Sequence, residues 1–419
     1  MPNKGPQWID GRGGNPTKSQ DVNDCLRAVR RAEVRGRGVA TSTKRALTEP
    51  EYLKCLELLR AKDSGGFNSK YKYVTMLITQ GHLIGRVDDI CHFKTADQKS
   101  HPTFAYGLSS SVRWSKNVLD ERACPDQIVL ASQDSSTCYV LNMALYMEQF
   151  LGWYPDAYHL FTEKDDEHAP DQLIQRFRQR LDKDCFKNPD FENLTEGQQR
   201  LTGGAGTHSI RKMFAQKARA MGAIIQQVEI RGRWKAAGNK VVHRYIDVNQ
   251  EYDDAYVASL LCSGGPIAYK IKDGFGFVND EFLFEHVCPN IAKRYGNDRN
   301  MVRVLGTALL YACMEDSLED MVPMAIKNRV TQAFIPRATA AGRVDPAEYN
   351  PVAKVPIVIY RVQDQLKIDL VEGDGIHPAQ VQAGRHGGAP AMAQGNQEQL
   401  NVVLIQLQQM KNNLVLMQS

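Results

Sequence analysis

The sequence has no apolar run long enough to cross a membrane. Its longest nearly continuous apolar stretch covers residues 305–314, whereas a transmembrane helix needs roughly 20 residues. The first residues, MPNKG, also lack the apolar core of a secretory signal peptide. We therefore expect a soluble, intracellular protein.

Cysteine frameworks and cofactor motifs are absent as well. The nine cysteines are scattered, odd in number and without a Cys-x-x-Cys pair, which argues against a disulfide scaffold and a zinc module. We interpret the pairs Cys91-His92 and His286-x-Cys288 as ordinary residues. The sequence also lacks a Walker phosphate loop, a dinucleotide-binding glycine pattern and a His-Glu-x-x-His motif, so it predicts neither a metal nor a cofactor.

The composition is that of a folded chain whose positive charge is concentrated near the amino terminus. Of 419 residues, 42% are hydrophobic and 24% are charged, which excludes a wholly disordered chain and favours two or three domains. The net charge is only +4, but residues 1–48 contain ten Lys or Arg against four Asp or Glu. This excess predicts a polyanionic partner such as DNA, although a solvated helix face fits the charge equally well. The candidate DNA-binding residues are Arg27, Arg30, Arg31, Arg35, Arg37, Lys44 and Arg45.

The hydrophobic pattern predicts an α+β fold that is mainly helical and contains a small antiparallel sheet. We expect helices at residues 21–34, 49–62, 71–81, 138–151 and 207–221. We expect strands at residues 90–93, 104–114 and 127–131, the last two forming a hairpin in which Leu108, Val112 and Trp114 share a buried face. Residues 160–200 are charged and irregular apart from 171–181, so we expect a surface insertion there.

Seven residues whose side chains could take part in catalysis occur in four local sequence patterns. An arginine at a predicted helix start is followed by an acid, a lysine stands at the hairpin tip, and a His-x-x-Arg pair shares one helix face. An Arg-Gly-Arg-Trp motif then precedes a tyrosine. Each pattern alone is weak, but chance would have to supply every member in sequence and in the right local context. The seven residues are, in chain order, Arg86, Asp89, Lys116, His208, Arg211, Trp234 and Tyr245.

These patterns resemble those of the tyrosine recombinases, specifically the Crypton-type recombinases of eukaryotic mobile elements. The likeness runs from about residue 15 to residue 269. It includes Gly85-Arg-Val-Asp-Asp, Arg113-Trp-Ser-Lys-Asn, His208-Ser-Ile-Arg-Lys, Arg231-Gly-Arg-Trp-Lys and Gly264-Gly-Pro-Ile-Ala-Tyr. The resemblance implies that Tyr245 is a nucleophile that forms a covalent 3′-phosphotyrosine with DNA.

The resemblance gives each remaining residue a role. Transfer at a DNA phosphodiester builds up negative charge on the phosphate, which Arg86 and Arg211 can clamp through their planar guanidinium groups. His208 could accept the tyrosine proton or bond the phosphate, and Trp234 could donate its indole N–H. Lys116 is the candidate general acid for the departing 5′-hydroxyl, and Asp89 supports the first arginine. No metal or nucleotide is implied.

The same resemblance divides the chain and implies its partners. We expect a basic arm with a remnant of a core-binding domain (1–46), a catalytic domain (47–262), a helical C-terminal domain (263–375), a flexible linker (376–395) and a short coiled-coil helix (396–419). The coiled coil is predicted from a heptad seam formed by Leu400, Val403, Leu407, Met410, Leu414 and Met417. Expected partners are double-stranded DNA and further copies of the chain in a tetrameric synapse, in the nucleus.

Three alternatives stay open at this point. One is a domesticated, non-catalytic DNA-binding protein on the same fold, as in the centromere-binding subunit of budding-yeast kinetochores, which resembles Crypton recombinases without their catalytic set. The second is a type IB topoisomerase, whose catalytic set is similar, although the His-x-x-Arg order and the tryptophan before the tyrosine fit recombinases better. The third is an interaction protein whose C-terminal helices only assemble subunits.

Overall fold

Helices dominate the computed structural model, and short antiparallel strands complete it, as the sequence predicts. The structure describes residues 19–37, 44–61, 67–115, 124–163, 166, 168–195, 204–234, 251–343 and 355–362. All of them belong to the first of two units into which the chain divides, Met1–Leu366. Lys116, Tyr245, the expected linker and the expected terminal coiled coil lie outside the described residues.

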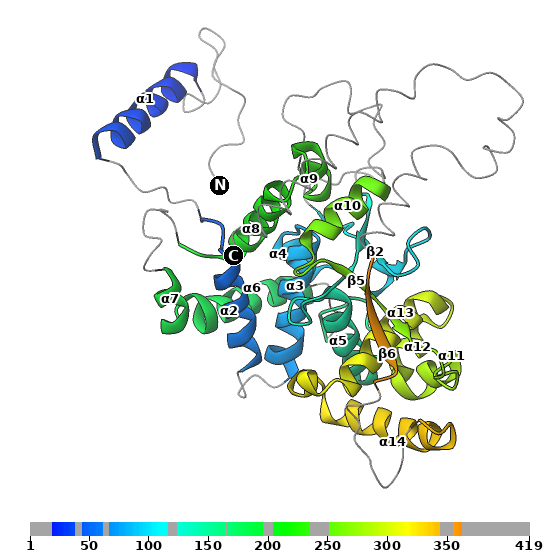
Figure 1. Cartoon of the computed structure of the whole chain (residues 1–419). Helices are drawn as coiled ribbons and strands as arrows, with labels where there is room; N and C mark the ends of the chain where they lie inside the picture. Colours follow the sequence, from blue (N-terminus) through cyan, green and yellow to red (C-terminus); the bar gives the residue numbers. More distant parts are fainter. Residues whose placement is uncertain are drawn as a thin grey trace, which may run out of the picture. The chain divides into compact units, whose positions relative to one another are not determined.

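The helices follow one another along the chain in the order drawn in Figure 1. The first seven are α1 (Gln20–Arg37), α2 (Glu49–Arg60), α3 (Val74–His82), α4 (Val87–Cys91), α5 (Tyr139–Trp153), α6 (Ala169–Leu181) and α7 (Pro189–Thr195). The next seven are α8 (Thr207–Ala220), α9 (Ile225–Arg231), α10 (Glu251–Leu261), α11 (Asp280–Phe282), α12 (Pro289–Tyr295), α13 (Arg299–Met314) and α14 (Met324–Ala340). Shorter π and 3₁₀ turns are η3 (Asn68–Tyr73), η4 (Thr95–Asp97), η6 (Asp182–Phe186), η9 (Leu283–Val287) and η10 (Asp316–Met321).

Within the described part of the chain, six strands form two three-stranded antiparallel sheets. They are β1 (Gln98–Ser100), β2 (Leu108–Ser111), β3 (Asp126–Val129), β4 (Ala131–Ser132), β5 (Pro266–Ile271) and β6 (Ile357–Arg361). The first sheet has the order β1-β2-β3, and the second has the order β4-β5-β6. Leu108 pairs with Val129 and Ser111 with Asp126, which confirms the predicted hairpin.

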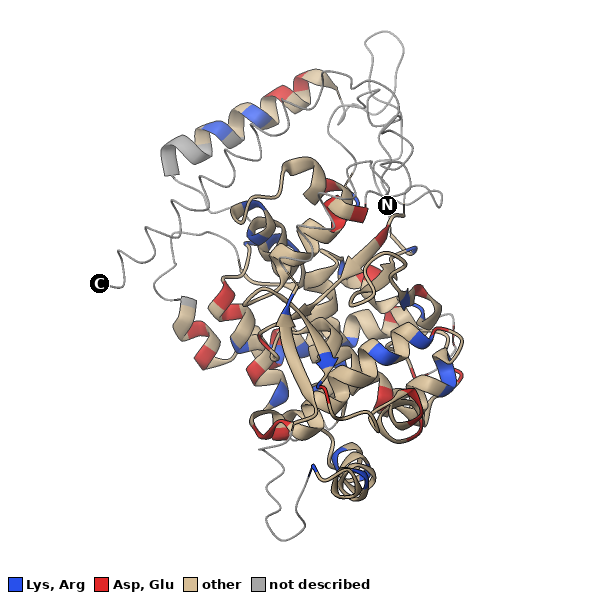
Figure 2. Cartoon of the chain, turned by 45° about the vertical axis from the view of Figure 1, so that its right-hand side comes forward, with Lys and Arg blue, Asp and Glu red and all other residues tan. Residues whose placement is uncertain are grey.

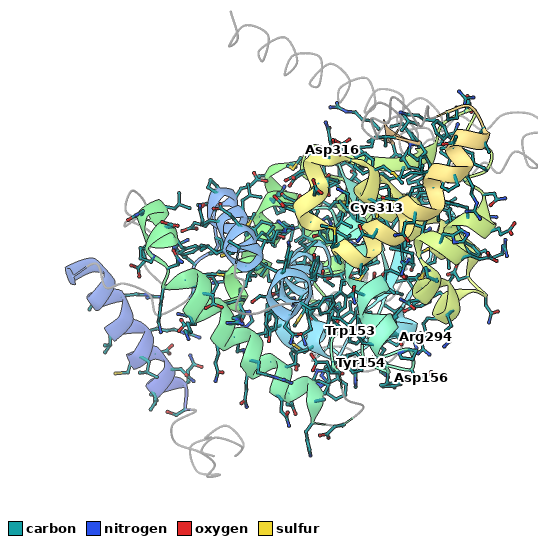
Figure 3. The ribbon with its side chains drawn as sticks, turned by 90° about the horizontal axis from the view of Figure 1, so that it is seen from below. Trp153, Tyr154, Asp156, Arg294, Cys313 and Asp316 are labelled. Atoms are coloured by element: carbon teal, nitrogen blue, oxygen red, sulfur yellow. The ribbon has the colours of Figure 1, made fainter. Side chains whose placement is uncertain are left out.

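The core is built around α5. Its sequence is apolar on nearly every side, as expected of a helix enclosed by other elements, and α3, α12 and α13 pack against it. Figure 3 views this packing from below, with Trp153 at the end of α5, Arg294 on α12 and Cys313 on α13. Arg294 donates to Thr95 Oγ1 at 2.9 Å and to the carbonyl of Ala157 at 3.4 Å, so it ties α12 to the turn η4, which precedes β1, and to the segment that follows α5.

Three local predictions are wrong. Residues 90–93 are not a strand, because Ile90 and Cys91 end α4 and His92 caps it. The strand expected at 104–114 is reduced to β2, whose four residues are all buried, while Trp114 is 55% exposed. Residues 160–200 are not merely a surface insertion, since α6, η6 and α7 place side chains in the core. These side chains are Leu173, Phe177, Leu181, Cys185 and Phe191.

The predicted helices around residues 21–34, 49–62, 71–81, 138–151 and 207–221 are confirmed as α1, α2, α3, α5 and α8. Helix α2 begins with a capping box, because Thr48 accepts from the amide of Glu51 and Glu51 accepts from that of Thr48. After α8 the backbone turns at Gly222, whose φ of +111° is open to glycine at little cost. Among the described residues, no helix combines the length and apolarity needed to span a membrane.

Candidate phosphate-binding site

The start of α4 is organised by Asp89. Arg86 precedes the helix with an extended backbone (φ −82°, ψ 157°), and the carboxylate of Asp89 accepts from the amide of Arg86 at 2.9 Å. This bond satisfies one of the amides that a helix leaves unpaired at its amino end. Asp89 is fully buried, so its negative charge needs partners nearby.

Two further arginines supply those partners from distant parts of the chain. Arg233 Nη2 lies 3.2 Å from Asp89 Oδ2, and Arg211 Nη1 lies 3.7 Å from the same oxygen. Arg233 follows α9 with a positive φ of 53°, a conformation that side-chain-bearing residues seldom adopt. Its Nη1 donates to Gln127 Oε1 of β3 at 2.8 Å. Burial lowers the pKa of Arg233, and the Asp89 carboxylate opposes that effect.

Arg211 is held on α8 by contacts on several sides. Its Nη2 donates to the carbonyl of Gly232, and its guanidinium carbon lies 4.4 Å from the centre of the Trp234 ring. Gly232 is required there, because a Cβ at this position would lie 2.2 Å from that ring. Burial, followed by the positive charges of Arg233 and Arg86, lowers the pKa of Arg211 to about 9. An anion beside it would offset both effects.

His208 lies one turn earlier on α8 and is exposed. Its pKa is lowered first by desolvation and then by the positive charges of Arg211 and Arg86. The imidazole is therefore mainly neutral at pH 7, and a neutral ring can accept a proton or a hydrogen bond. The structure thus brings Arg86, His208 and Arg211 near one another, with Asp89 in contact with both arginines and Trp234 beside Arg211.

Two buried guanidinium nitrogens in this cluster, Arg86 Nη1 and Arg211 Nη1, donate no hydrogen bond within the described part of the chain. Arg211 Nη1 lies 3.7 Å from Asp89 Oδ2, which is an ion-pair contact beyond hydrogen-bond range. A buried donor without an acceptor costs about 1–3 kcal/mol, so two of them in adjacent arginines call for an explanation. An anion with several oxygens, such as a phosphate, would supply acceptors to both.

Arg231 and Arg233 are functional supports that the sequence reasoning did not identify. Arg231 is only 1% exposed and donates to the carbonyls of His82 at 3.0 Å and Ile128 at 2.8 Å, besides an ion pair with Asp254. It therefore ties the end of α9 to α3, β3 and α10. The signal was present in the Arg-Gly-Arg-Trp motif, but nothing in that motif alone says that both arginines are buried.

The remaining predicted residues are placed only in part. Lys116 and Tyr245 lie outside the described residues, although β2 and β3 flank the segment that contains Lys116. Arg27 on α1 pairs with Asp24 at 3.2 Å, and Figure 2 shows acidic as well as basic residues on that helix.

Among the other residues of the basic arm, Arg31 and Lys44 are exposed. Arg45 Nη1 instead donates to the buried Glu51 at 2.8 Å. The side chains of Arg30, Arg35 and Arg37 lie outside the description.

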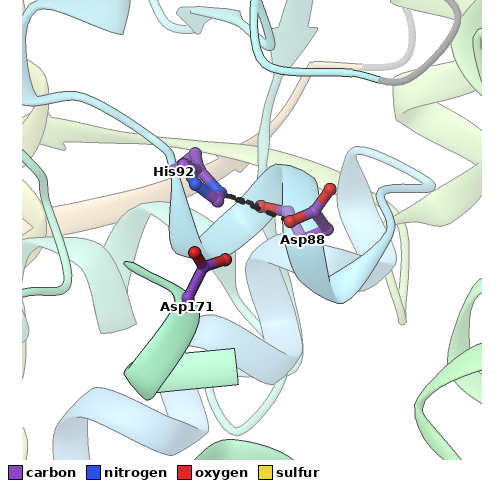
Figure 4. A group of neighbouring side chains, drawn as sticks. All are labelled: Asp88, His92 and Asp171. Atoms are coloured by element: carbon purple, nitrogen blue, oxygen red, sulfur yellow. Dashed lines mark hydrogen bonds and ion pairs between the residues drawn. The ribbon is translucent and has the colours of Figure 1, made fainter. Parts of the chain in front are cut away.

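One group of described residues has the composition of a metal site. Asp88, His92 and Asp171 bring one potential ligand atom each to within 4.8 Å of one another, from α4 and the first turn of α6 (Figure 4). His92 Nδ1 already donates to the carbonyl of Asp88 at 3.0 Å and lies 3.4 Å from its carboxylate. The ring of His92 therefore already contacts Asp88 within α4, and Asp171 brings a second carboxylate close to this pair from α6.

Comparison with known proteins gives no relative. No protein-family model matches the chain, and no curated protein sequence matches it.

Proposed function

We propose that this protein is a DNA-binding tyrosine recombinase that cleaves and rejoins DNA strands through a covalent 3′-phosphotyrosine at Tyr245. The observation that carries the proposal is the convergence of Arg86, His208 and Arg211 around the buried Asp89, with two guanidinium donors left without acceptors. These residues come from segments more than 100 positions apart in the sequence. They have the types and order of the recombinase catalytic set.

The chemistry follows from the charges in the cluster. Two guanidinium groups can bind the nonbridging oxygens of a phosphodiester and stabilise the extra negative charge of the transition state. The neutral His208 can accept the proton of Tyr245, whose hydroxyl is otherwise a poor nucleophile near neutral pH. Lys116, on the segment between β2 and β3, would protonate the departing 5′-hydroxyl. The bond energy is retained in the phosphotyrosine, so a second 5′-hydroxyl can attack it and rejoin the strands.

The wider setting of the reaction is part of the same proposal. Strand exchange in this family uses several copies of the chain on DNA, so we propose a tetrameric synapse in the nucleus in which residues 396–419 contribute to self-association. The basic arm, including Arg27, Arg31 and Lys44, would contact phosphates outside the cleavage site. We also propose that the α+β fold of the chain is that of a recombinase catalytic domain.

A trapping experiment tests the proposed function. The full chain is incubated with a pool of duplexes whose sequence flanking a single nick is randomised, so that cleavage next to the nick releases a short strand and cannot be reversed. Denaturing gels should show a covalent protein–DNA band for the wild type and none for Tyr245→Phe. If both proteins bind DNA equally and neither gives the band, the non-catalytic DNA-binding alternative is correct.

A further inference from the structure

A cavity lies at the C-terminal end of α4, and none of the residues of the arginine cluster lines it. It has a volume of about 580 Å³, and its walls are mostly aromatic and imidazole rings. The residues that line it are His92, Lys94, Trp114, Tyr158, His159, Asp166 and Pro170. The proposed recombination chemistry uses none of them.

One wall of the cavity is a stacked pair of rings. Trp114 and His92 lie face to face, with ring centres 4.1 Å apart and planes inclined by 8°. His92 is fixed from behind, because its Nδ1 donates to the carbonyl of Asp88 at 3.0 Å. Trp114 is nevertheless 55% exposed, which leaves much of a large flat ring open to a ligand. A planar aromatic ligand would extend this stack.

The charged residues that line the cavity indicate whether a cationic or a neutral planar ligand fits it better. The ammonium group of Lys94 lies 4.8 Å from the centre of the Tyr158 ring. Aromatic rings also bind cationic ligands such as methylated ammonium groups, but here the protein's own lysine already supplies a cation over Tyr158. A neutral planar ring fits this arrangement better, because the lining contains one basic and one acidic residue, Lys94 and Asp166. A nucleobase is such a ring.

The cavity and the arginine cluster lie at opposite ends of the same short helix, α4. Arg86 begins α4 and His92 caps its end, so the rise of the helix separates them by about 9 Å. Trp114 also precedes Lys116, the proposed general acid, by only two positions.

We propose that this cavity binds an unpaired nucleobase of the strand whose phosphate lies between Arg86 and Arg211, with the base stacked on Trp114. The inference rests on the proposed function and deepens it, since it assigns the protein a preference for locally unpaired DNA. A base inside a duplex would first have to leave its stack, whereas an already unpaired base enters without that cost.

Fluorescence anisotropy with two single-stranded probes tests the proposal. One probe is a ten-nucleotide oligothymidylate, and the other has the same backbone and phosphates but abasic sugars. The wild-type full chain should bind the oligothymidylate about tenfold more tightly than the abasic strand, as expected for one stacked base. Trp114→Ala should bind both strands with the same affinity, whereas Trp114→Phe should retain most of the preference.

The control variant is Trp153→Ala, because Trp153 is similarly exposed at 53% but lies on α5 outside the cavity. It should keep the full preference. Equal binding of both probes by the wild type, or an unchanged preference in Trp114→Ala, would overturn the base-binding site. The double variant Arg86→Ala, Arg211→Ala should reduce the affinity for both probes by the same factor. If it reduces neither affinity, these arginines do not bind phosphate, and this result is distinguishable from a loss of the base preference.

Discussion

Replacement of Asp89 should reveal how strongly the arginine cluster depends on one buried carboxylate. Asp89 is fully buried and lies 2.9 Å from the amide of Arg86, 3.2 Å from Arg233 and 3.7 Å from Arg211. Removing one partner of a buried ion pair costs about 3–5 kcal/mol, because the opposite charge is left uncompensated. We therefore expect Asp89→Ala to lower the free energy of unfolding by about 3–5 kcal/mol, or roughly 3–6 °C in Tm for a chain of 419 residues.

The isosteric variant Asp89→Asn separates charge from shape. Its amide oxygen can still accept from Arg86 N–H, so we expect a smaller loss of about 1–3 kcal/mol. Without the carboxylate the cluster is more positive, and phosphate should therefore bind the folded variant more tightly and restore part of its stability.

The assay is urea and thermal denaturation of the full chain, with and without phosphate, at constant ionic strength. Asp182→Asn is the control, because Asp182 is 55% exposed in its ion pair with Lys187, and such surface pairs contribute about 0–1 kcal/mol. If Asp89→Ala costs no more than the control, or phosphate stabilises Asp89→Asn no more than the wild type, the cluster does not function as an anion clamp.

Four further outcomes are expected. Gly81→Ala should lower the free energy of unfolding by about 1–3 kcal/mol in urea titrations, because its Cβ would lie 2.4 Å from the Phe214 ring. The control Gly276→Ala should have little effect, because the space around its Cβ is open. Burial raises the pKa of Glu148 from 4.5 to about 7, so the folded protein binds this proton more tightly than the unfolded chain does. The free energy of unfolding of the wild type, relative to that of Glu148→Gln, should therefore fall as the pH rises from about 4.5 to 7. Parallel curves of unfolding free energy against pH for the two proteins would contradict this. NMR titration of His208 should give a pKa below 6.5 that rises when phosphate is added, and an unchanged pKa would argue against phosphate beside it. DNA affinity should fall steeply with salt concentration, and charge-neutralising variants of the basic arm should reduce the slope of log affinity against log salt.

Long helices could be predicted from the sequence because each carries its own periodic signal. Ile210, Met213, Phe214 and Ala218 repeat at helical spacing, and they form the buried stripe of α8. Residues 90–93 carry no such signal, since a run of four mostly apolar residues fits a buried strand and a short helix equally well. Ile90 and Cys91 end α4 instead, and the start of this helix is held by Asp89, which accepts a hydrogen bond from the amide of the N-cap residue Arg86.

Residues 160–200 were misjudged from their charge. The exposed faces of α6 and α7 carry many charged side chains, but Leu173, Phe177 and Leu181 repeat every four residues and pack into the core. This spacing was visible in the sequence. Composition over a window averages the two faces of an amphipathic helix, so it hides a buried stripe that residue-by-residue periodicity shows.

The candidate site was predictable in its arginines and histidine but not in its support. Arg86, His208 and Arg211 were selected by their order and local context, and the fold places these three residues near one another. Arg231 and Arg233 have roles that depend on carbonyls and carboxylates brought together by the fold, including those of His82 and Asp89. Such tertiary contacts leave no periodic or local signal in a single sequence.

Identification of the covalently modified residue tests the central claim most directly. After reaction with the nicked duplexes, the protein is digested with trypsin and nuclease, and the peptide that remains linked to a nucleotide is fragmented in a mass spectrometer. Trypsin releases residues 245–270 as one peptide that contains Tyr245 and three other tyrosines, so fragmentation can distinguish among them. The account predicts a nucleotide phosphate on Tyr245 alone, and an adduct on any other residue would contradict it.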